Sequence, residues 1–136
     1  MAKGLFKKRL RDRSDIMILS AGVGALPGMR PTQETIDIMA RHGIDVSTHL
    51  SQRLTDEMVE QADLILVMER GHKSEILKRV PGAKKKVFLL REYAENASVS
   101  PRIDIEVPDP IAKPADVYES CFRMIQESVE GVIKQL

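Results

Sequence analysis

Few residues in this sequence could do chemistry, and the most distinctive is Asp109, an aspartate held between two prolines in "VPDPI". Proline on both sides restricts the backbone and so fixes the direction in which the carboxylate points. A rigidly aimed carboxylic acid on a loop suits general acid catalysis. Asp-Pro pairs are also frequent in ordinary turns, so the motif alone leaves both interpretations open.

The single cysteine, Cys121, is a poor candidate for a nucleophile. It shares one helical face with Val117, Ile125 and Val132, which is the pattern of a buried packing residue. A reactive thiolate needs an electropositive and partly open setting instead. One cysteine also excludes an internal disulfide and a multi-cysteine metal or redox site, and it is typical of a protein from a reducing cytoplasm.

The histidines and the glycine-rich stretch give weaker signals. No histidine is spaced with cysteine or carboxylates as a metal site requires, so neither a metal nor another cofactor is expected. His49 lies in the polar cluster "STHLS", which indicates a hydrogen-bond network. The stretch "SAGVGALPG" fits neither the P-loop nor the dinucleotide-binding glycine pattern. On sequence alone it is better interpreted as a structural turn.

The elements that must position these residues alternate in type. Short apolar runs predict buried strands at Ile16–Ser20, Asp63–Met68 and Val87–Leu90. Helices are predicted at the basic start of the chain, at Gln33–His42 after Thr32 as N-cap and before Gly43 as stop, after Thr55 as N-cap, at Gly71–Arg79, and from Pro114 to the end. This alternation indicates one α/β domain over residues 1–136, with a parallel sheet flanked by helices.

Ligands of such sheets bind beyond the carboxyl ends of the strands. The segment after Ser20, the stretch "MERGH" and the long connection at residues 91–113 are therefore expected at the active end. Asp109 lies in the last of these.

The charge distribution is uneven although the net charge is only +1. Residues 1–13 carry a local balance of +5, and the remainder carries −4. The favoured interpretation is the solvated face of an amphipathic helix. A basic arm that binds nucleic acid or a membrane surface is less favoured, because the charged run is only about two to three helical turns long and Phe6, its one aromatic residue, belongs to the apolar stripe of the helix. No apolar run approaches the ~18 residues of a membrane span.

Five stretches, in their order and spacing, resemble the low-molecular-weight protein phosphatase family, which includes phosphotyrosine and bacterial phosphoarginine phosphatases. They are "SAGVGALPG", "TIDIMARHGIDVSTHLSQRLT", "ADLILVMERGHKSEI", "KVFLLREY" and "DPIAKPADVYESC". The resemblance implies a three-layer, phosphotyrosine protein phosphatase I-like α/β fold with a short parallel sheet. It also implies a cytoplasmic enzyme without a cofactor, acting on a phosphorylated protein or a small aryl phosphate.

In that family a Cys-x5-Arg loop cradles the phosphate and its thiolate attacks phosphorus, forming a phosphocysteine intermediate. The Asp of the Asp-Pro pair protonates the leaving group and later acts as base. The resemblance therefore implies that Asp109 is the general acid and that Ser20 and His49 brace the phosphate loop. Val23, Leu26 and Ile111 would form the wall of the substrate pocket. None of these three is aromatic, which favours a protein-arginine or general phosphatase over a dedicated phosphotyrosine enzyme.

No Cys-x5-Arg occurs in the 136 residues. Met1 resembles a methionine inside the family's first helix, so we expect an N-terminally truncated chain that lacks the first, central strand, the nucleophile and the arginine. Such a chain is predicted to have no turnover by the family mechanism. The alternative is a non-catalytic homologue that acts as a binding or regulatory module.

A missing central strand would leave Ile16–Ser20 and Asp63–Met68 with unpaired edges. Three outcomes are expected from this: a destabilised fold, direct pairing of those two strands, or compensation by another chain, including a homo-oligomer.

Overall fold

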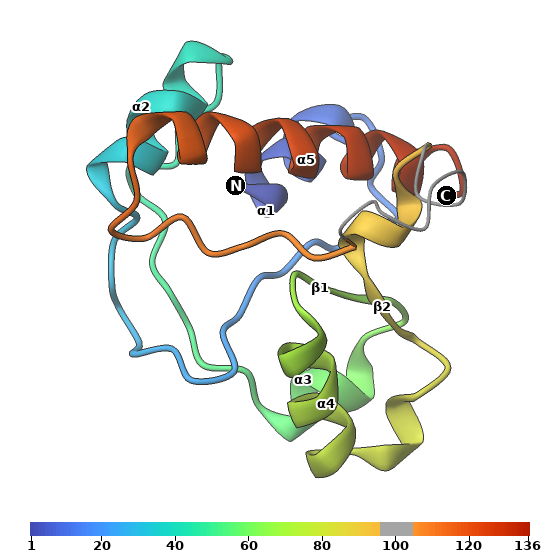
Figure 1. Ribbon diagram of the computed structural model, residues 1–136. Coiled ribbons are helices and arrows are strands. Elements are labelled where there is room, and N and C mark those ends of the chain that lie inside the picture. Colours follow the sequence, from blue (N-terminus) through green and yellow to red (C-terminus); the bar gives the residue numbers. More distant parts are fainter. Residues whose placement is uncertain (96–104) are drawn as a thin grey trace.

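The computed structural model describes residues 1–95 and 105–136, so residues 96–104 of the predicted 91–113 connection lie outside the described part. The elements are arranged in three layers (Figure 1), with α1, α2 and α5 on one side of a short sheet and α3 and α4 on the other. In chain order they are α1 Ala2–Arg9, α2 Gln33–Arg41, α3 Asp56–Gln61, β1 Ile65–Val67, α4 Arg70–Arg79, the 3-10 turn η1 Pro81–Ala83, β2 Val87–Leu89, the 3-10 turn η2 Leu90–Tyr93, and α5 Ala115–Ile133. The predicted α/β class is confirmed.

The helix ends follow the capping residues in the sequence. Thr32 Oγ1 accepts a hydrogen bond from Thr35 N–H at 3.3 Å, and Thr55 Oγ1 accepts one from Met58 N–H at 3.2 Å. Both predicted N-caps are therefore confirmed. The backbone of Gly43 has a φ of 73°, which glycine adopts readily just after a helix.

Two of the three predicted strands form a ladder, and the third prediction is wrong. β1 and β2 run parallel, with the pairs Ile65–Val87, Leu66–Phe88 and Val67–Leu89. Within the described residues, 16–20 join no ladder, and the closest pairing along the chain is an isolated bridge from Gly22 to Arg53. Exposure alternates residue by residue from 16 to 20, as in an extended chain. The segment thus has the sequence of a strand, but among the described residues it pairs with no neighbour, β1 included.

Apolar side chains pack in two clusters, one for each helical layer. The larger, here called the α5 cluster, joins α1, α2, η2 and α5; its buried members are Leu5, Phe6, Leu10, Ile38, Met39, Ile44, Leu90, Val107, Cys121, Phe122, Ile125, Val129 and Val132. The smaller, here called the α4 cluster, joins α3, α4 and the two strands; its buried members are Val59, Val67, Ile76, Ala83, Val87 and Leu89. Cys121 is 1% exposed, so its predicted packing role is confirmed.

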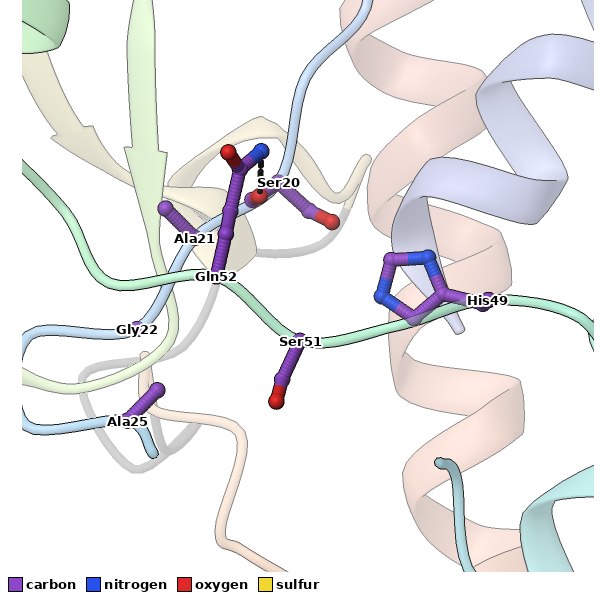
Figure 2. A pocket seen from close by; sticks show the side chains of 7 residues that line it. All are labelled: Ser20, Ala21, Gly22, Ala25, His49, Ser51 and Gln52. Atoms are coloured by element: carbon purple, nitrogen blue, oxygen red, sulfur yellow. Dashed lines mark hydrogen bonds between the residues drawn. The ribbon is translucent and has the colours of Figure 1, made fainter. Parts of the chain in front are cut away.

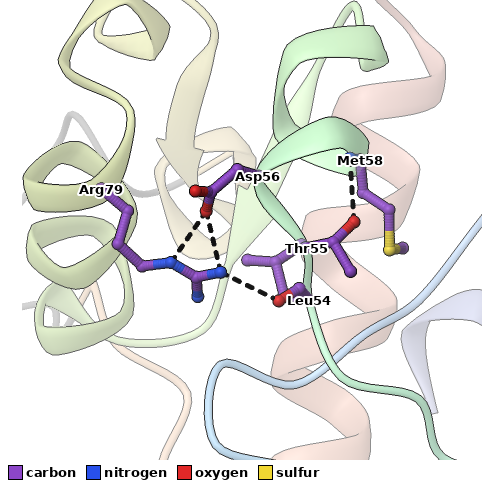
Figure 3. A network of polar contacts seen from close by, with 5 residues as sticks. All are labelled: Leu54, Thr55, Asp56, Met58 and Arg79. Atoms are coloured by element: carbon purple, nitrogen blue, oxygen red, sulfur yellow. Dashed lines mark hydrogen bonds and ion pairs between the residues drawn. The ribbon is translucent and has the colours of Figure 1, made fainter.

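Arg79, in the last turn of α4, ties that helix to the start of α3 (Figure 3). Its guanidinium contacts Asp56 Oδ1 at 2.8 and 2.9 Å and donates to the carbonyl oxygen of Leu54 at 3.1 Å. A planar guanidinium can direct several donors at fixed angles. These contacts hold the chain just after residue 53, where it leaves the Gly22–Arg53 bridge.

The last helix approaches η2 most closely at Gly131. A Cβ atom at this position would lie 1.7 Å from the carbonyl oxygen of Tyr93 and 2.7 Å from its carbonyl carbon. No side chain fits there, because the obstacle is backbone. The contact therefore fixes how α5 lies along η2.

Candidate active site

Ser20 and His49, which are distant in sequence, line one cavity of about 220 Å³. The remaining lining residues come from the same two loops: Ala21, Gly22, Ala25, Ser51 and Gln52. Figure 2 shows the hydroxyl of Ser20 and the imidazole of His49 pointing toward the space between the two loops. Both side chains are half-buried. The two residues implied to brace a phosphate loop are therefore brought together.

Gly22 and Gln52 join the two loops under this cavity. Gly22 N–H donates to Gln52 O at 2.9 Å, and Leu54 N–H donates to Gly22 O at 2.9 Å. The Gln52 side chain donates from Nε2 to the carbonyl oxygen of Ser20 at 2.8 Å. Gln52 was not identified from the sequence. Its only signal was its neighbourhood, a polar run beside His49.

Ser51 fastens the glycine-rich stretch from the other side. Its hydroxyl donates to Leu26 O at 2.5 Å and accepts from Met29 N–H at 2.9 Å. Backbone bonds reinforce the contact, from Ser51 N–H to Met29 O at 2.8 Å and from Gly28 N–H to Ser51 O at 2.9 Å. The stretch "SAGVGALPG" is thus a structural turn, as predicted, and it is held open as one wall of the cavity.

The electrostatic environment of His49 is positive. Desolvation by burial lowers the pKa of its imidazole, and the positive charges of Lys3, the amino group of Met1 and Lys7 lower it further. Burial also lowers the pKa of the Met1 amino group. The positive charges near His49 therefore disfavour a further positive charge on its imidazole.

Asp109 lies on an exposed loop that is tied to the carboxyl end of β1. Val107 N–H donates to Met68 O, one residue beyond the strand, at 2.9 Å. The thiol of Cys121 donates to Pro108 O at 3.3 Å. The carboxylate itself accepts a hydrogen bond from Ile111 N–H at 3.1 Å. The loop lies at the end of the sheet predicted for it, and its acid is oriented by its own backbone.

A further contact holds the same loop against α4. The backbone N–H of Arg70, the first residue of α4, donates to Glu106 Oε1 at 2.9 Å. The Arg70 guanidinium lies 3.4 Å from the same carboxylate. A carboxylate at a helix N-terminus is favoured by the helix dipole. The acid loop is thus fastened to β1, α4 and α5.

Cys121 lies beside this loop but is unsuited to attack a phosphate. Burial raises the pKa of its thiol, and the negative charge of Asp109 raises it further. A thiol in this setting stays protonated at neutral pH.

The other predicted site residues lie outside the cavity lining. Val23 packs against the α4 cluster. Leu26 and Ile111 are 70% and 60% exposed. Asp109 and these three side chains are absent from the residues that line the cavity.

Across residues 1–95 and 105–136, no three or more His, Cys, Asp or Glu side chains gather as a metal site would require. In the same part of the chain, no helix combines the length and apolarity needed to cross a membrane.

Comparison with known proteins places this chain in a family. The model of the family described as "low molecular weight phosphotyrosine protein phosphatase" matches residues 1–136. Over 136 residues, the chain is 35% identical to the probable low molecular weight protein-tyrosine-phosphatase EpsP of Ralstonia nicotianae, covering all of this chain and 86% of the relative. It is 31% identical to the protein-arginine-phosphatase of Bacillus subtilis, covering all of this chain and 87% of the relative.

Solved structures agree with this assignment. The tyrosine phosphatase amsI of Erwinia amylovora has a TM-score of 0.85 at 26% identity, over 99% of this chain and 82% of that one. The YwlE arginine phosphatase, solved as a Cys-to-Ser mutant with a phosphorylated active-site serine, has a TM-score of 0.85 at 32% identity, over 99% and 85%. The chain belongs to the low-molecular-weight phosphotyrosine protein phosphatase family, and the resemblance seen in the sequence is confirmed.

Proposed function

We propose that this chain is the larger part of a cytoplasmic protein phosphatase that acts through a phosphocysteine intermediate, with Asp109 as general acid and then base. The observation that carries the proposal is the fastening of the Asp109 loop at the carboxyl end of β1. A carboxylic acid held there can protonate the leaving group of a phosphate bound beyond the sheet.

The nucleophile and the phosphate-binding arginine are not among the 136 residues, since the one cysteine is Cys121 and no Cys-x5-Arg is present. We propose that a segment outside these residues carries both, and that its loop is braced by Ser20 and His49. The positive charges of Lys3 and Lys7 near His49 support an anionic occupant. On its own, the 136-residue chain would then have an acid but nothing to activate the phosphate.

The substrate is a phosphorylated protein side chain, either phosphotyrosine or phosphoarginine. The relatives named above include both a tyrosine and an arginine phosphatase. Val23, Leu26 and Ile111 offer no aromatic ring to stack on a tyrosine, which supports phosphoarginine.

Hydrolysis assays test the proposal. The 136-residue chain should hydrolyse neither para-nitrophenyl phosphate nor a phosphoarginine peptide. The same chain preceded by a segment containing Cys-x5-Arg should hydrolyse at least one of them. In that longer form Asp109→Asn should lower kcat by about 10²–10⁴-fold, the usual contribution of a general acid.

Asp63→Asn is the matched control, because Asp63 lies before β1, at the end opposite the acid loop. Unchanged kcat in Asp109→Asn would contradict the general acid role. If the 136-residue chain alone showed turnover, and Asp109→Asn abolished it, the need for a further segment would be contradicted. If the intact mass of the protein isolated from its source shows that the chain begins at Met1, the non-catalytic binding or regulatory module becomes the better proposal.

A further inference from the structure

Glu106, three residues before Asp109, caps a helix to which it does not belong. The backbone N–H of Arg70, the first residue of α4, donates to Glu106 Oε1 at 2.9 Å, across 36 positions of sequence. Within residues 69–79, all of which the structure describes, Glu69 at the N-cap makes no side-chain cap bond and the first turn contains no acidic residue. A carboxylate bonded to a first-turn N–H satisfies an otherwise unpaired donor and is favoured by the helix dipole. Glu106 therefore supplies the cap that the sequence of α4 lacks.

The two residues after Glu106 attach the acid loop to other layers. Val107 N–H donates to the carbonyl oxygen one residue beyond β1 at 2.9 Å, and its side chain is 3% exposed in the α5 cluster. The carbonyl oxygen of Pro108 accepts a hydrogen bond from the Cys121 thiol at 3.3 Å. Figure 1 shows this segment, coloured orange, passing between α5 and the layer of α4. Three consecutive residues thus fix the chain just before Asp109, and Glu106 provides the contact with α4.

Asp109 depends on these contacts for its position. It is exposed, and its carboxylate is bonded to the N–H of Ile111, which belongs to the same loop. That bond orients the carboxylate within the loop but not relative to the sheet. A general acid must lie within hydrogen-bond reach of the leaving oxygen, and a shift of about 1 Å can cost on the order of 10²-fold in rate. The anchoring of residues 106–108 therefore decides where the acid lies.

We propose that Glu106 is a positioning residue for Asp109: by capping α4, its carboxylate holds the acid loop at the carboxyl end of β1. This inference rests on the proposed function, because a general acid has work to do only where a phosphate is bound. The decisive contact is the hydrogen bond from the backbone N–H of Arg70. The Arg70 side chain is 63% exposed and lies 3.4 Å from the carboxylate, and exposed ion pairs of this kind contribute little.

Two substitutions at position 70 separate the cap from the ion pair. Arg70→Ala and Arg70→Pro both remove the guanidinium, but only proline removes the backbone N–H. Proline is tolerated at the first position of a helix. Glu69 before it has an extended backbone, with φ −133° and ψ 153°, which a residue preceding proline favours. The helix should therefore form in both variants, and the difference between them measures the cap alone.

Hydrogen exchange of the 136-residue chain, followed by NMR, measures how firmly the loop is held. In Arg70→Pro and in Glu106→Ala, the Val107 amide should exchange about five- to tenfold faster than in the parent chain, as expected for the loss of one cap. Arg70→Ala should stay close to the parent. The Leu54 amide, bonded to Gly22 O in another part of the fold, is the internal reference. Equal exchange of the Val107 amide in Arg70→Pro and Arg70→Ala would overturn the proposal.

Kinetics of the longer form, which contains Cys-x5-Arg, test the effect on the acid. Phenyl phosphate releases a phenol whose pKa is about 10, as in tyrosine, so its leaving oxygen needs a proton. The nitro group of para-nitrophenyl phosphate stabilises the departing oxyanion without one. Arg70→Pro should therefore lower kcat/KM by about tenfold or more for phenyl phosphate, and by clearly less for para-nitrophenyl phosphate. A merely structural defect would lower both values equally.

Further variants control for charge and for the route of the effect. Glu75→Ala removes a carboxylate from the exposed middle of α4 and should leave kcat/KM unchanged for both substrates. Glu106→Gln retains an acceptor oxygen and should recover part of the loss seen in Glu106→Ala. In a chain that already carries Asp109→Asn, Arg70→Pro should add little, because the group that it misplaces is gone.

An equal loss of kcat/KM for both substrates, or an undiminished loss in the Asp109→Asn background, would overturn the positioning role. Unchanged Val107 exchange together with full turnover would overturn it alone and leave the phosphatase in place. If the parent longer form hydrolyses neither substrate, the proposed function and the positioning role fall together.

Discussion

Two apolar segments of similar sequence reached different structures. The first, Val87–Leu89, forms a ladder with β1 and contributes two residues to the α4 cluster. The second, "IMILS" at residues 16–20, is at least as apolar, yet it joins no ladder in the described part of the chain. Apolar composition therefore brings a segment to the core, but only a neighbour at hydrogen-bonding distance makes it a strand.

The largest effect is expected from disturbing the contact between α5 and η2. Gly131→Ala would place a methyl group against the Tyr93 carbonyl, where a Cβ has 1.7 Å. We expect a loss of about 4 kcal/mol or more in the free energy of unfolding, measured by urea denaturation. Gly71→Ala, in α4, is the control. It has open space around the Cβ position and should be neutral or stabilising by up to about 1 kcal/mol.

Two leucine truncations compare the paired strand β2 with the unpaired residues 16–20 directly. Leu89 is 3% exposed in the ladder, and Leu19 is 60% exposed in the unpaired segment. Leu89→Ala should destabilise by about 3 kcal/mol, whereas Leu19→Ala should change stability by no more than about 0.5 kcal/mol. Chemical denaturation of both variants is the measurement. Equal losses of stability in the two variants would mean that residues 16–20 are buried in solution and that the contrast between the two segments is wrong.

The helix caps extend the comparison to the outer layers. Thr55→Ala, on the α4 side, should cost about 1 kcal/mol, because it removes the bond to Met58 N–H. Thr32→Ala should cost more. The Thr32 hydroxyl also contacts Thr35 Oγ1 at 3.0 Å and the Tyr118 hydroxyl at 3.3 Å. Serine at either position retains an oxygen and should recover most of the loss, as thermal denaturation would reveal.

The smallest expected effect is the pH dependence due to His49. Burial and the nearby positive charges hold its pKa in the folded state below the ordinary value of about 6.5, so the unfolded chain binds the proton more tightly. Folding stability should therefore fall as the pH is lowered through about 6.5. In His49→Gln the decrease in Tm between pH 8 and pH 5.5 should be smaller. An identical pH profile in the variant would show that His49 is not the responsible group.

Much of this arrangement could be predicted from local signals. The caps at Thr32 and Thr55, the stop at Gly43 and the burial of Cys121 each depend on nearby residues, and each was confirmed. The strand at 16–20 was mispredicted because pairing is a property of two segments, and the pattern of one cannot reveal a partner. For the same reason, the sequence pointed to His49 but not to the bond between Gln52 and Ser20.

The buried state of Cys121 also has a practical consequence. A thiol that is 1% exposed, protonated and bonded to Pro108 should react slowly with alkylating reagents in the native protein. The 136 residues should therefore contribute little signal in a thiol-labelling experiment. Any rapidly labelled cysteine in a longer form of this protein would report on the proposed nucleophile, and the labelling stoichiometry would then give the fraction of competent active sites in a preparation.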